Sequence, residues 1–171
     1  MRYLIYLVTI LLSVSVAAAQ AHSESSWREF RSDADGFWIE MPQTPKTESR
    51  DLGEGQTQKF FQIEIGPETY LASVIQLNPG RVPASPDQAY FDVLLKAYTD
   101  GSKTTLRSSR LFTWAGHPAV EGISDGDGTA HLIDITTAGD RIFLVVYAGV
   151  KGQETTPKAM HMRNSFTLLG K

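Results

Sequence analysis

The chain has 171 residues, no cysteine and a formal net charge of -3 at pH 7. Without cysteine it has no disulfides, iron–sulfur clusters, thiolate zinc sites or lipoprotein anchor, since each of these needs a thiol. The mildly acidic chain also lacks the basic stripe that nucleic-acid binding requires and has no electrostatic attraction to anionic membranes. We therefore expect no nucleic-acid partner.

Residues 1–21 have the pattern of a secretory signal peptide. Arg2 supplies a positive start, an apolar run follows, and small residues cluster at 17–21. Cleavage is predicted after Ala21, with Ala19 as the alternative. A retained anchor is disfavoured because the run is shorter than the ~20 apolar residues of a comfortable span. Loss of Arg2 would change the formal charge from -3 to -4.

The remainder, residues 22–171, is predicted to be one soluble domain, periplasmic or secreted, with no stable membrane insertion. A domain of this size buries ~70% of its unfolded surface, which is enough for a core without disulfides. Its first half reads as extended segments and turns. Strands are predicted at 27–31 and 37–41, a polar loop at 43–56, and a hairpin of strands 57–65 and 70–77.

A helix is predicted to begin at the sequence Ser85-Pro86-Asp87-Gln88, where Ser85 suits the cap and Pro86 the first helical position. Gly101 is the predicted left-handed C-cap. Between them lies an apolar stripe at helical spacing. The stripe comprises Phe91, Leu94, Leu95 and Tyr98.

Four strands are predicted next, at 103–113, 119–124, 129–137 and 141–150, with tight turns that favour antiparallel neighbours. The last of them is apolar on both faces, which indicates a strand covered on both sides. A second helix begins near Pro157, and a closing strand follows at 166–169. The predicted fold class is α+β, an antiparallel sheet of about six strands flanked by helices.

Four phrases at matching places resemble the PsbP-like domain, an α-β-α sandwich found in a photosystem extrinsic protein and in many bacterial proteins. The resemblance covers residues 27–169 and implies that fold. It also implies an accessory role by docking, because the understood members act without catalysis. The phrases are Phe37-Trp38-Ile39-Glu40-Met41-Pro42 with Pro45, Trp114-Ala115-Gly116-His117-Pro118-Ala119, Gly139-Asp140-Arg141-Ile142-Phe143 and Asn164-Ser165-Phe166.

One motif suggests an alternative function as a periplasmic serine hydrolase. The sequence around Ser124 fits G-x-S-x-G, with Asp134 or Asp140 and then His161 in the usual chain order, or with His131 as the base. The nucleophile elbow needs a strand before the serine and a helix after it. Here a glycine-rich turn and a strand are predicted to follow, which disfavours catalysis at Ser124.

No metal or cofactor site is expected. Asp125-Gly126-Asp127-Gly128 resembles the start of a calcium loop, but the further ligands are missing and Asp-Gly pairs are typical of hairpin turns. The four histidines form no pair at metal-ligand spacing. We expect His131 to be half-buried and hydrogen-bonded, because it shares a strand face with isoleucines.

The interaction candidates are Trp38 and a basic group of Lys103, Arg107 and Arg110. Lys103 and Arg107 are predicted to share a strand face, as a docking patch for an acidic surface or as charges that guard a sheet edge. Trp38 points away from Phe37, so it is covered by the C-terminal helix or marks an interface. The sequence thus predicts an exported accessory or binding domain that acts on a protein or small-molecule partner.

Overall fold

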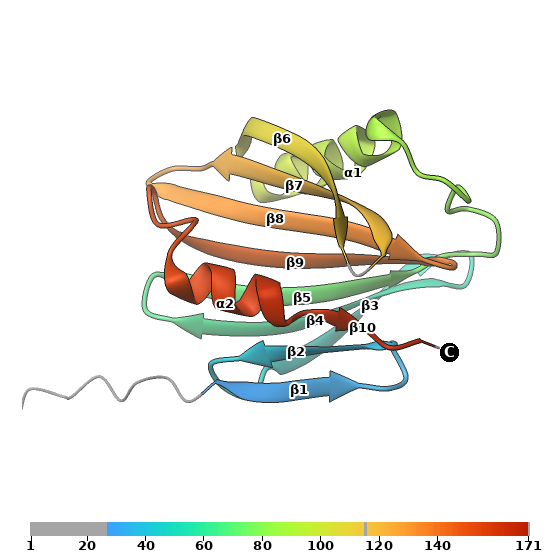
Figure 1. The fold of residues 1–171 in the computed structure, drawn as a ribbon, viewed down its shortest axis with the longest axis horizontal. Helices are drawn as coiled ribbons and strands as arrows, with labels where there is room; N and C mark the ends of the chain where they lie inside the picture. Colours follow the sequence, from blue (N-terminus) through green and yellow to red (C-terminus); the bar gives the residue numbers. More distant parts are fainter. Residues whose placement is uncertain (1–26, 115, 171) are drawn as a thin grey trace, which may run out of the picture.

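The computed structural model describes residues 27–114 and 116–170 (Figure 1). The predicted signal peptide and both candidate cleavage sites lie outside the described residues. Within the described part, no helix is both long enough and apolar enough to cross a membrane.

The larger of two antiparallel sheets has seven strands in the order β3-β4-β5-β9-β8-β7-β6. Consecutive strands pair as hairpins, and β5 joins β9 in the middle of the sheet through pairs such as Tyr70 with Tyr147. The strands are β3 (Lys46–Gly53), β4 (Gln56–Ile65), β5 (Glu68–Gln76), β6 (Thr105–Trp114), β7 (His117–Asp125), β8 (Thr129–Ala138) and β9 (Arg141–Val150).

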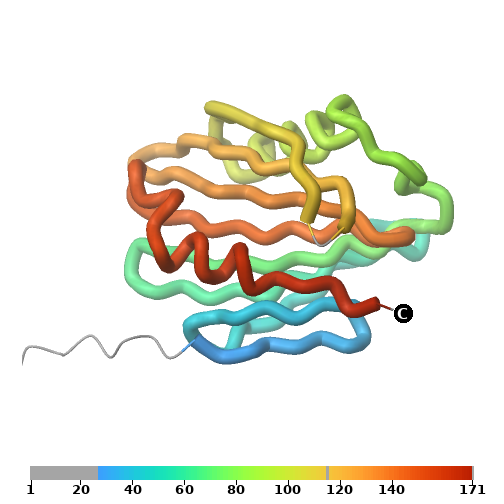
Figure 2. Tube along the Cα trace, viewed as in Figure 1, coloured from blue at the N-terminus to red at the C-terminus, as the bar shows by residue number. Residues whose placement is uncertain are grey.

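The smaller sheet has three strands in the order β1-β2-β10. They are β1 (Arg28–Ser32), β2 (Phe37–Met41) and β10 (Thr167–Leu168). The C-terminal strand pairs with the second strand of the domain, so the two ends of the described chain lie in one sheet. Figure 2 shows the C-terminal segment running out beside the turn between β1 and β2.

The two helices found in the described residues lie on opposite faces of the seven-stranded sheet, α2 (Pro157–Ser165) in front and α1 (Gln88–Ser102) behind in Figure 1. On the α1 side, Phe91 and Leu95 are fully buried against the sheet, as the predicted apolar stripe requires. On the other side, α2 and the small sheet cover a second core around Phe37 and Met162. Burial of each such side chain stabilises the fold by about 1.5–3 kcal/mol.

Strand β9 separates these two cores. Phe143, Val145 and Tyr147 belong to the core on the α2 side, whereas Ile142, Leu144 and Val146 belong to the core on the α1 side. The prediction of a strand covered on both faces is therefore confirmed.

The expected sheet of about six strands is wrong in strand number and in strand partition. Residues 46–53 were predicted within a loop, but they form β3, an edge strand whose eight residues are all exposed. Its backbone pairs with β4, so the strand exists without the buried alternating face that sequence patterns detect. Strand β2 pairs with β1 and β10, which places it in a separate sheet.

The boundaries of α1 also differ from the prediction. Asp87, rather than Ser85, caps the helix, because its side chain accepts a hydrogen bond from the Tyr90 N–H at 2.9 Å. The helix continues past Gly101 and ends at Lys103, which adopts the left-handed conformation with φ 55°. Similarly, His117 and Pro118 belong to β7 instead of a turn.

Candidate ligand-binding groove

The predicted basic group does not form one free patch. Lys103 is the C-cap of α1 and does not share a strand face with Arg107. Arg107 lies at a bulge of β6 and forms ion pairs with Glu154 and, at 3.4 Å, Asp125. Arg110 forms a two-pronged ion pair with Glu121, with N–O distances of 2.7 and 2.9 Å. Acidic partners therefore compensate both strand arginines.

Trp38 lies in the small sheet, on a different element from the basic group. It is partly buried, and its neighbours across the strands are Arg31 and Thr167. From α2, His161 contacts the Glu40 carboxylate, and the Ser165 hydroxyl accepts a hydrogen bond from the Glu40 N–H at 2.9 Å. These contacts place α2 along β2, while cover of Trp38 itself by that helix stays a prediction.

The surroundings of Ser124 do not support the serine-hydrolase alternative. Ser124 is fully buried, its hydroxyl has no hydrogen-bond partner among the described residues, and strand β8 follows the turn after it. His131 lies opposite Ser124 in the strand ladder, but its Nδ1 is 2.8 Å from the hydroxyl of Tyr98 on α1. Among the described residues, its hydrogen-bond partners therefore do not include Ser124. Burial lowers the pKa of His131, and the predicted half-buried, hydrogen-bonded histidine is confirmed.

The supposed calcium loop is a hairpin turn. The Asp125 carboxylate is 2.8 Å from Lys151 Nζ, and the Gly126 N–H donates to the Thr129 carbonyl across the turn. Gly128 has φ 73°, a conformation that favours glycine. Among residues 27–114 and 116–170, no group of three acidic or histidine side chains is placed to hold a metal.

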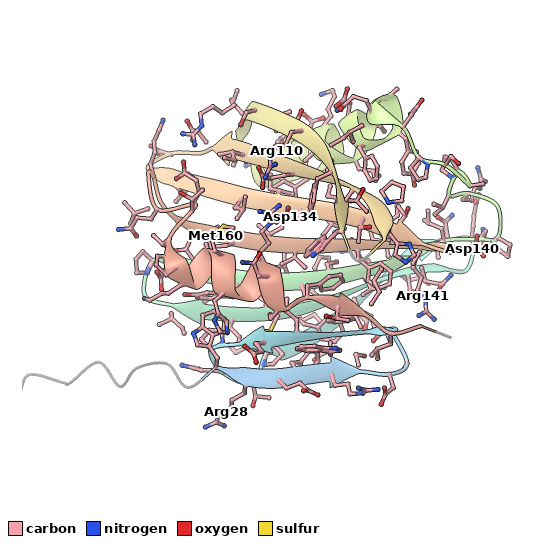
Figure 3. All side chains as sticks on the ribbon, viewed as in Figure 1. Arg28, Arg110, Asp134, Asp140, Arg141 and Met160 are labelled. Atoms are coloured by element: carbon pink, nitrogen blue, oxygen red, sulfur yellow. The ribbon has the colours of Figure 1, made fainter. Side chains whose placement is uncertain are left out.

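A closed cluster of charges fixes α2 to the sheet. Arg163 of α2 contacts Glu121 of β7 at 2.7 Å and Asp134 of β8 at 3.0 Å, and its guanidinium lies 4.9 Å from the centre of the Phe112 ring. Asp134 is 1% exposed, and this burial raises its pKa to about 7, although Arg163 opposes the shift. Figure 3 shows Asp134 near the middle of the sheet and Arg110 above it, toward the β6 edge.

A groove of about 750 Å³ lies at one end of the molecule, where the two sheets meet. Five segments line it: the β1–β2 turn, the end of β5, the start of β7, the β8–β9 turn and the C-terminal segment. Backbone hydrogen bonds join these segments, from Leu169 to the Gly36 carbonyl at 2.8 Å and from Leu77 to the Asp140 carbonyl at 2.9 Å. The groove thus combines chain segments that are distant in sequence.

Arg141 is held in this groove by a neutral side chain. Its Nε donates to Gln76 Oε1 at 2.9 Å, and Gln76 Nε2 in turn donates to the Leu77 carbonyl at 2.9 Å. Gly36 makes room for the guanidinium, because a Cβ at that position would lie 2.7 Å from Arg141 Nη1. Figure 3 shows Arg141 next to Asp140 at the end of the sheet opposite Arg28.

Arg141 differs from the other described arginines in having little exposure and no acid partner. Only Arg141 and Arg163 among the arginines of residues 27–114 and 116–170 are not exposed. Arg163 has two carboxylates, whereas Arg141 forms no ion pair with a described residue. The rest of the groove is mixed in character. Its lining includes Arg31, Asp33, His117, Asp140, Phe143, Leu168 and Leu169.

Another hollow, of about 290 Å³, lies against β3 and β4. It is lined by exposed edge-strand side chains such as Lys46 and Glu48, together with Phe60. It brings together only neighbouring segments and holds no anchored arginine. The larger groove is therefore the better candidate for a site.

Comparison with solved structures identifies the fold. The solution structure of cyanobacterial PsbP (CyanoP) from Synechocystis sp. PCC 6803 superposes with a TM-score of 0.54 at 14% identity, over 90% of this chain and 98% of that one. The fold is PsbP-like. This confirms the resemblance predicted from the sequence as far as the fold, since identity this low carries no function.

A crystal structure from Bacteroides thetaiotaomicron VPI-5482 matches more weakly, with a TM-score of 0.40 and 14% identity over 84% of this chain and 49% of that one. No family model matches the chain, and no curated protein does so either. The PsbP-like fold therefore rests on the first structural match and on the arrangement of the sheets.

Sequence reasoning did not identify the groove residues as a site. The phrase around Arg141 was recognised only as a turn of the PsbP-like pattern. Gln76 is 65 residues away in sequence from Arg141, and no motif links the two. A glycine at position 36, the last residue of the turn before β2, is the one local signal that the backbone there needs space.

Proposed function

We propose that this protein is an exported accessory or binding domain, periplasmic or secreted, that acts by protein or small-ligand contacts rather than by catalysis. Its ligand site is the groove at the end of the two sheets. The observation that carries the proposal is the anchored, uncompensated Arg141 in the largest hollow described above. Such a concave site with a few placed polar groups is typical of ligand recognition.

Two further observations support the non-catalytic part. The fold is shared with cyanobacterial PsbP. The sequence resemblance to PsbP-like domains implies that the understood members act by docking on partners. The best sequence candidate for a nucleophile, Ser124, is buried without a hydrogen-bonded base. Export is supported by the signal-peptide pattern of residues 1–21.

The proposal is tested by blocking the groove. Ala34 is exposed in the β1–β2 turn and lines the groove, so Ala34→Trp fills it, whereas Ala97→Trp on the exposed face of α1 is the matched control. A fragment library of mixed charge is screened by ¹H–¹⁵N NMR. We expect binders that shift groove amides in the wild type and in Ala97→Trp but not in Ala34→Trp.

Two results would contradict the groove as the ligand site. One is binding of fragments that Ala34→Trp leaves unaffected, and the other is a screen in which no fragment shifts the groove amides. Export has a separate test, in which the N-terminus of the protein recovered from the cell envelope is sequenced. A mature chain that starts at Gln20 or His22 is expected, and an intact Met1 would contradict export.

A further inference from the structure

The guanidinium of Arg141 is the most specific feature of the groove. Its Nε is occupied by Gln76, which leaves the Nη1 and Nη2 groups without an acceptor among the described residues. A partly buried charge without a partner is costly to keep, and a bound anion would offset that cost. We infer that the groove binds a small monocarboxylate with an apolar body and that Arg141 holds the carboxylate. This inference rests on the proposed function.

The geometry suits a planar, two-pronged acceptor. Guanidinium and carboxylate groups pair through two parallel N–H···O bonds, which adds specificity as well as energy. Gln76 fixes the plane of the guanidinium before a ligand arrives, and Gly36 packs against it at the side of Nη1. Because the side chain is already ordered, binding loses little conformational entropy.

The charge balance favours a monoanion. Two arginines line the groove, Arg31 and Arg141, and two aspartates line it as well, Asp33 and Asp140. Asp33 pairs with Arg31 at 2.8 Å, and Asp140 accepts a hydrogen bond from the Gly80 N–H at 2.9 Å. These four charges sum to zero. Because Arg31 and Asp33 neutralise each other, Arg141 is left for a ligand with Asp140 beside it in the lining, so the second negative charge of a dianion such as a phosphate monoester would have no guanidinium to pair with.

Part of the remaining wall is apolar. Phe143, Leu168 and Leu169 contribute to the lining and come from β9 and the C-terminal segment. Leu168 and Leu169 are partly exposed and offer an alkyl or aryl group a surface to cover, with Phe143 packed beneath in the core, while the carboxylate faces Arg141. A ligand with both parts uses the whole groove, and neither a free inorganic anion nor an alkane does so.

The test uses octanoate as the probe, with octanol, octylammonium and octyl phosphate as matched ligands, measured by calorimetry on the purified chain. The variant is Arg141→Gln, and Arg28→Gln at the opposite end of the molecule is its control (Figure 3). We expect Arg141→Gln to weaken octanoate binding by roughly ten- to a hundredfold, the loss expected for charge-assisted hydrogen bonds. Arg28→Gln should leave it unchanged.

Arg141→Lys provides a second variant that keeps the charge and removes the two-pronged geometry, so it should fall between wild type and Arg141→Gln. Thermal melts confirm that each variant is folded. Octanol binding as tightly as octanoate, or octanoate binding unchanged in Arg141→Gln, would overturn the inference. Tighter binding of octyl phosphate would assign the site to a phosphate ester instead.

Absence of octanoate binding would also overturn the inference, and the groove itself is then judged by the separate Ala34→Trp experiment. If that library screen finds neutral or cationic binders in the groove, the proposed function stands without the carboxylate. If it finds none, both fail. The two failures are therefore distinguishable.

Discussion

The two least exposed arginines of the described chain have opposite surroundings. Arg163 lies inside the fold, where it pairs with Glu121 and Asp134 and lies over the Phe112 ring. Arg141 lies in a groove and, among the described residues, has only the Gln76 amide as a side-chain partner. One arginine, Arg163, thus connects α2 to the sheet, whereas the other, Arg141, faces the open groove.

The difference separates a structural role from a binding role. A buried ion pair is satisfied by the protein itself, and removing one partner leaves the other as an uncompensated charge. A guanidinium without an acid partner depends on solvent or on a ligand for its remaining hydrogen bonds. We expect Arg163 to matter for stability and Arg141 for binding.

Arg163→Met should give the largest effect. It leaves Asp134 buried without its cation, and breaking such a pair costs about 3–5 kcal/mol. We expect a cost near the lower end, because the Asp134 carboxylate can take up a proton when its pKa is already about 7. Urea unfolding measures the loss. A change of less than about 1 kcal/mol, the range of exposed arginines such as Arg28, would contradict the structural role.

The second prediction concerns pH. The native pKa of Asp134 is about 7, above the unfolded value of ~3.9, so between these values the native state binds more protons. The contribution of Asp134 to stability is therefore present at low pH and is lost as the pH rises through about 7. From pH 5 to 8 the stability of the wild type relative to Asp134→Asn should fall by about 2–3 kcal/mol. If the difference in unfolding free energy between the wild type and Asp134→Asn does not change from pH 5 to 8, the raised pKa of Asp134 is wrong.

Gly36→Ala should have an intermediate effect on stability and should also disturb the groove. Gly36 has φ 79°, where a Cβ costs about 1–2 kcal/mol, and the new Cβ would also lie 2.7 Å from Arg141 Nη1. Gly66→Ala is the control, because it has φ 59° and no atom within 4 Å of the new Cβ. Two results together would contradict the close packing of Gly36 against Arg141. These are an equal loss of stability of both variants in thermal melts and an Arg141 side-chain NMR signal that does not move in Gly36→Ala.

Arg141→Gln should have the smallest effect on the fold. The substitution removes one hydrogen bond from a charged donor to a neutral amide, worth about 1.5–3 kcal/mol, and also removes an unpaired, partly buried charge, which offsets much of that loss. We expect a net change within about 1 kcal/mol in urea unfolding. A loss as large as that of Arg163→Met would remove the distinction between the two arginines.

Local patterns predicted the parts of the fold that have a regular buried face. The strand β9 was predicted from its continuous apolar run, which is buried on both faces. The helix α1 was predicted from apolar residues at the helical spacing, which are buried on one face. Strand β3 was missed, since all its residues are exposed and only its backbone pairing makes it a strand. The separate three-stranded sheet was missed because β2 joins β10, near the other end of the chain.

The candidate site was beyond sequence reasoning for the same reason. The contact between Gln76 and Arg141 and that between Leu169 and Gly36 depend on how distant segments meet. The predicted candidates Arg107 and Arg110 were plausible from charge alone, but the sequence could not indicate that Glu154 and Glu121 neutralise them. Burial and partners, rather than residue type, decide which arginine is available.

The most direct test compares both arginines in one experiment, an NMR titration that follows arginine side-chain Nε–H signals while octanoate is added. Our account predicts that the Arg141 signal shifts in a saturable way, while the signal of Arg163 stays in place. Equal shifts of both signals, or a saturable shift at Arg163 or Arg28 without one at Arg141, would contradict it.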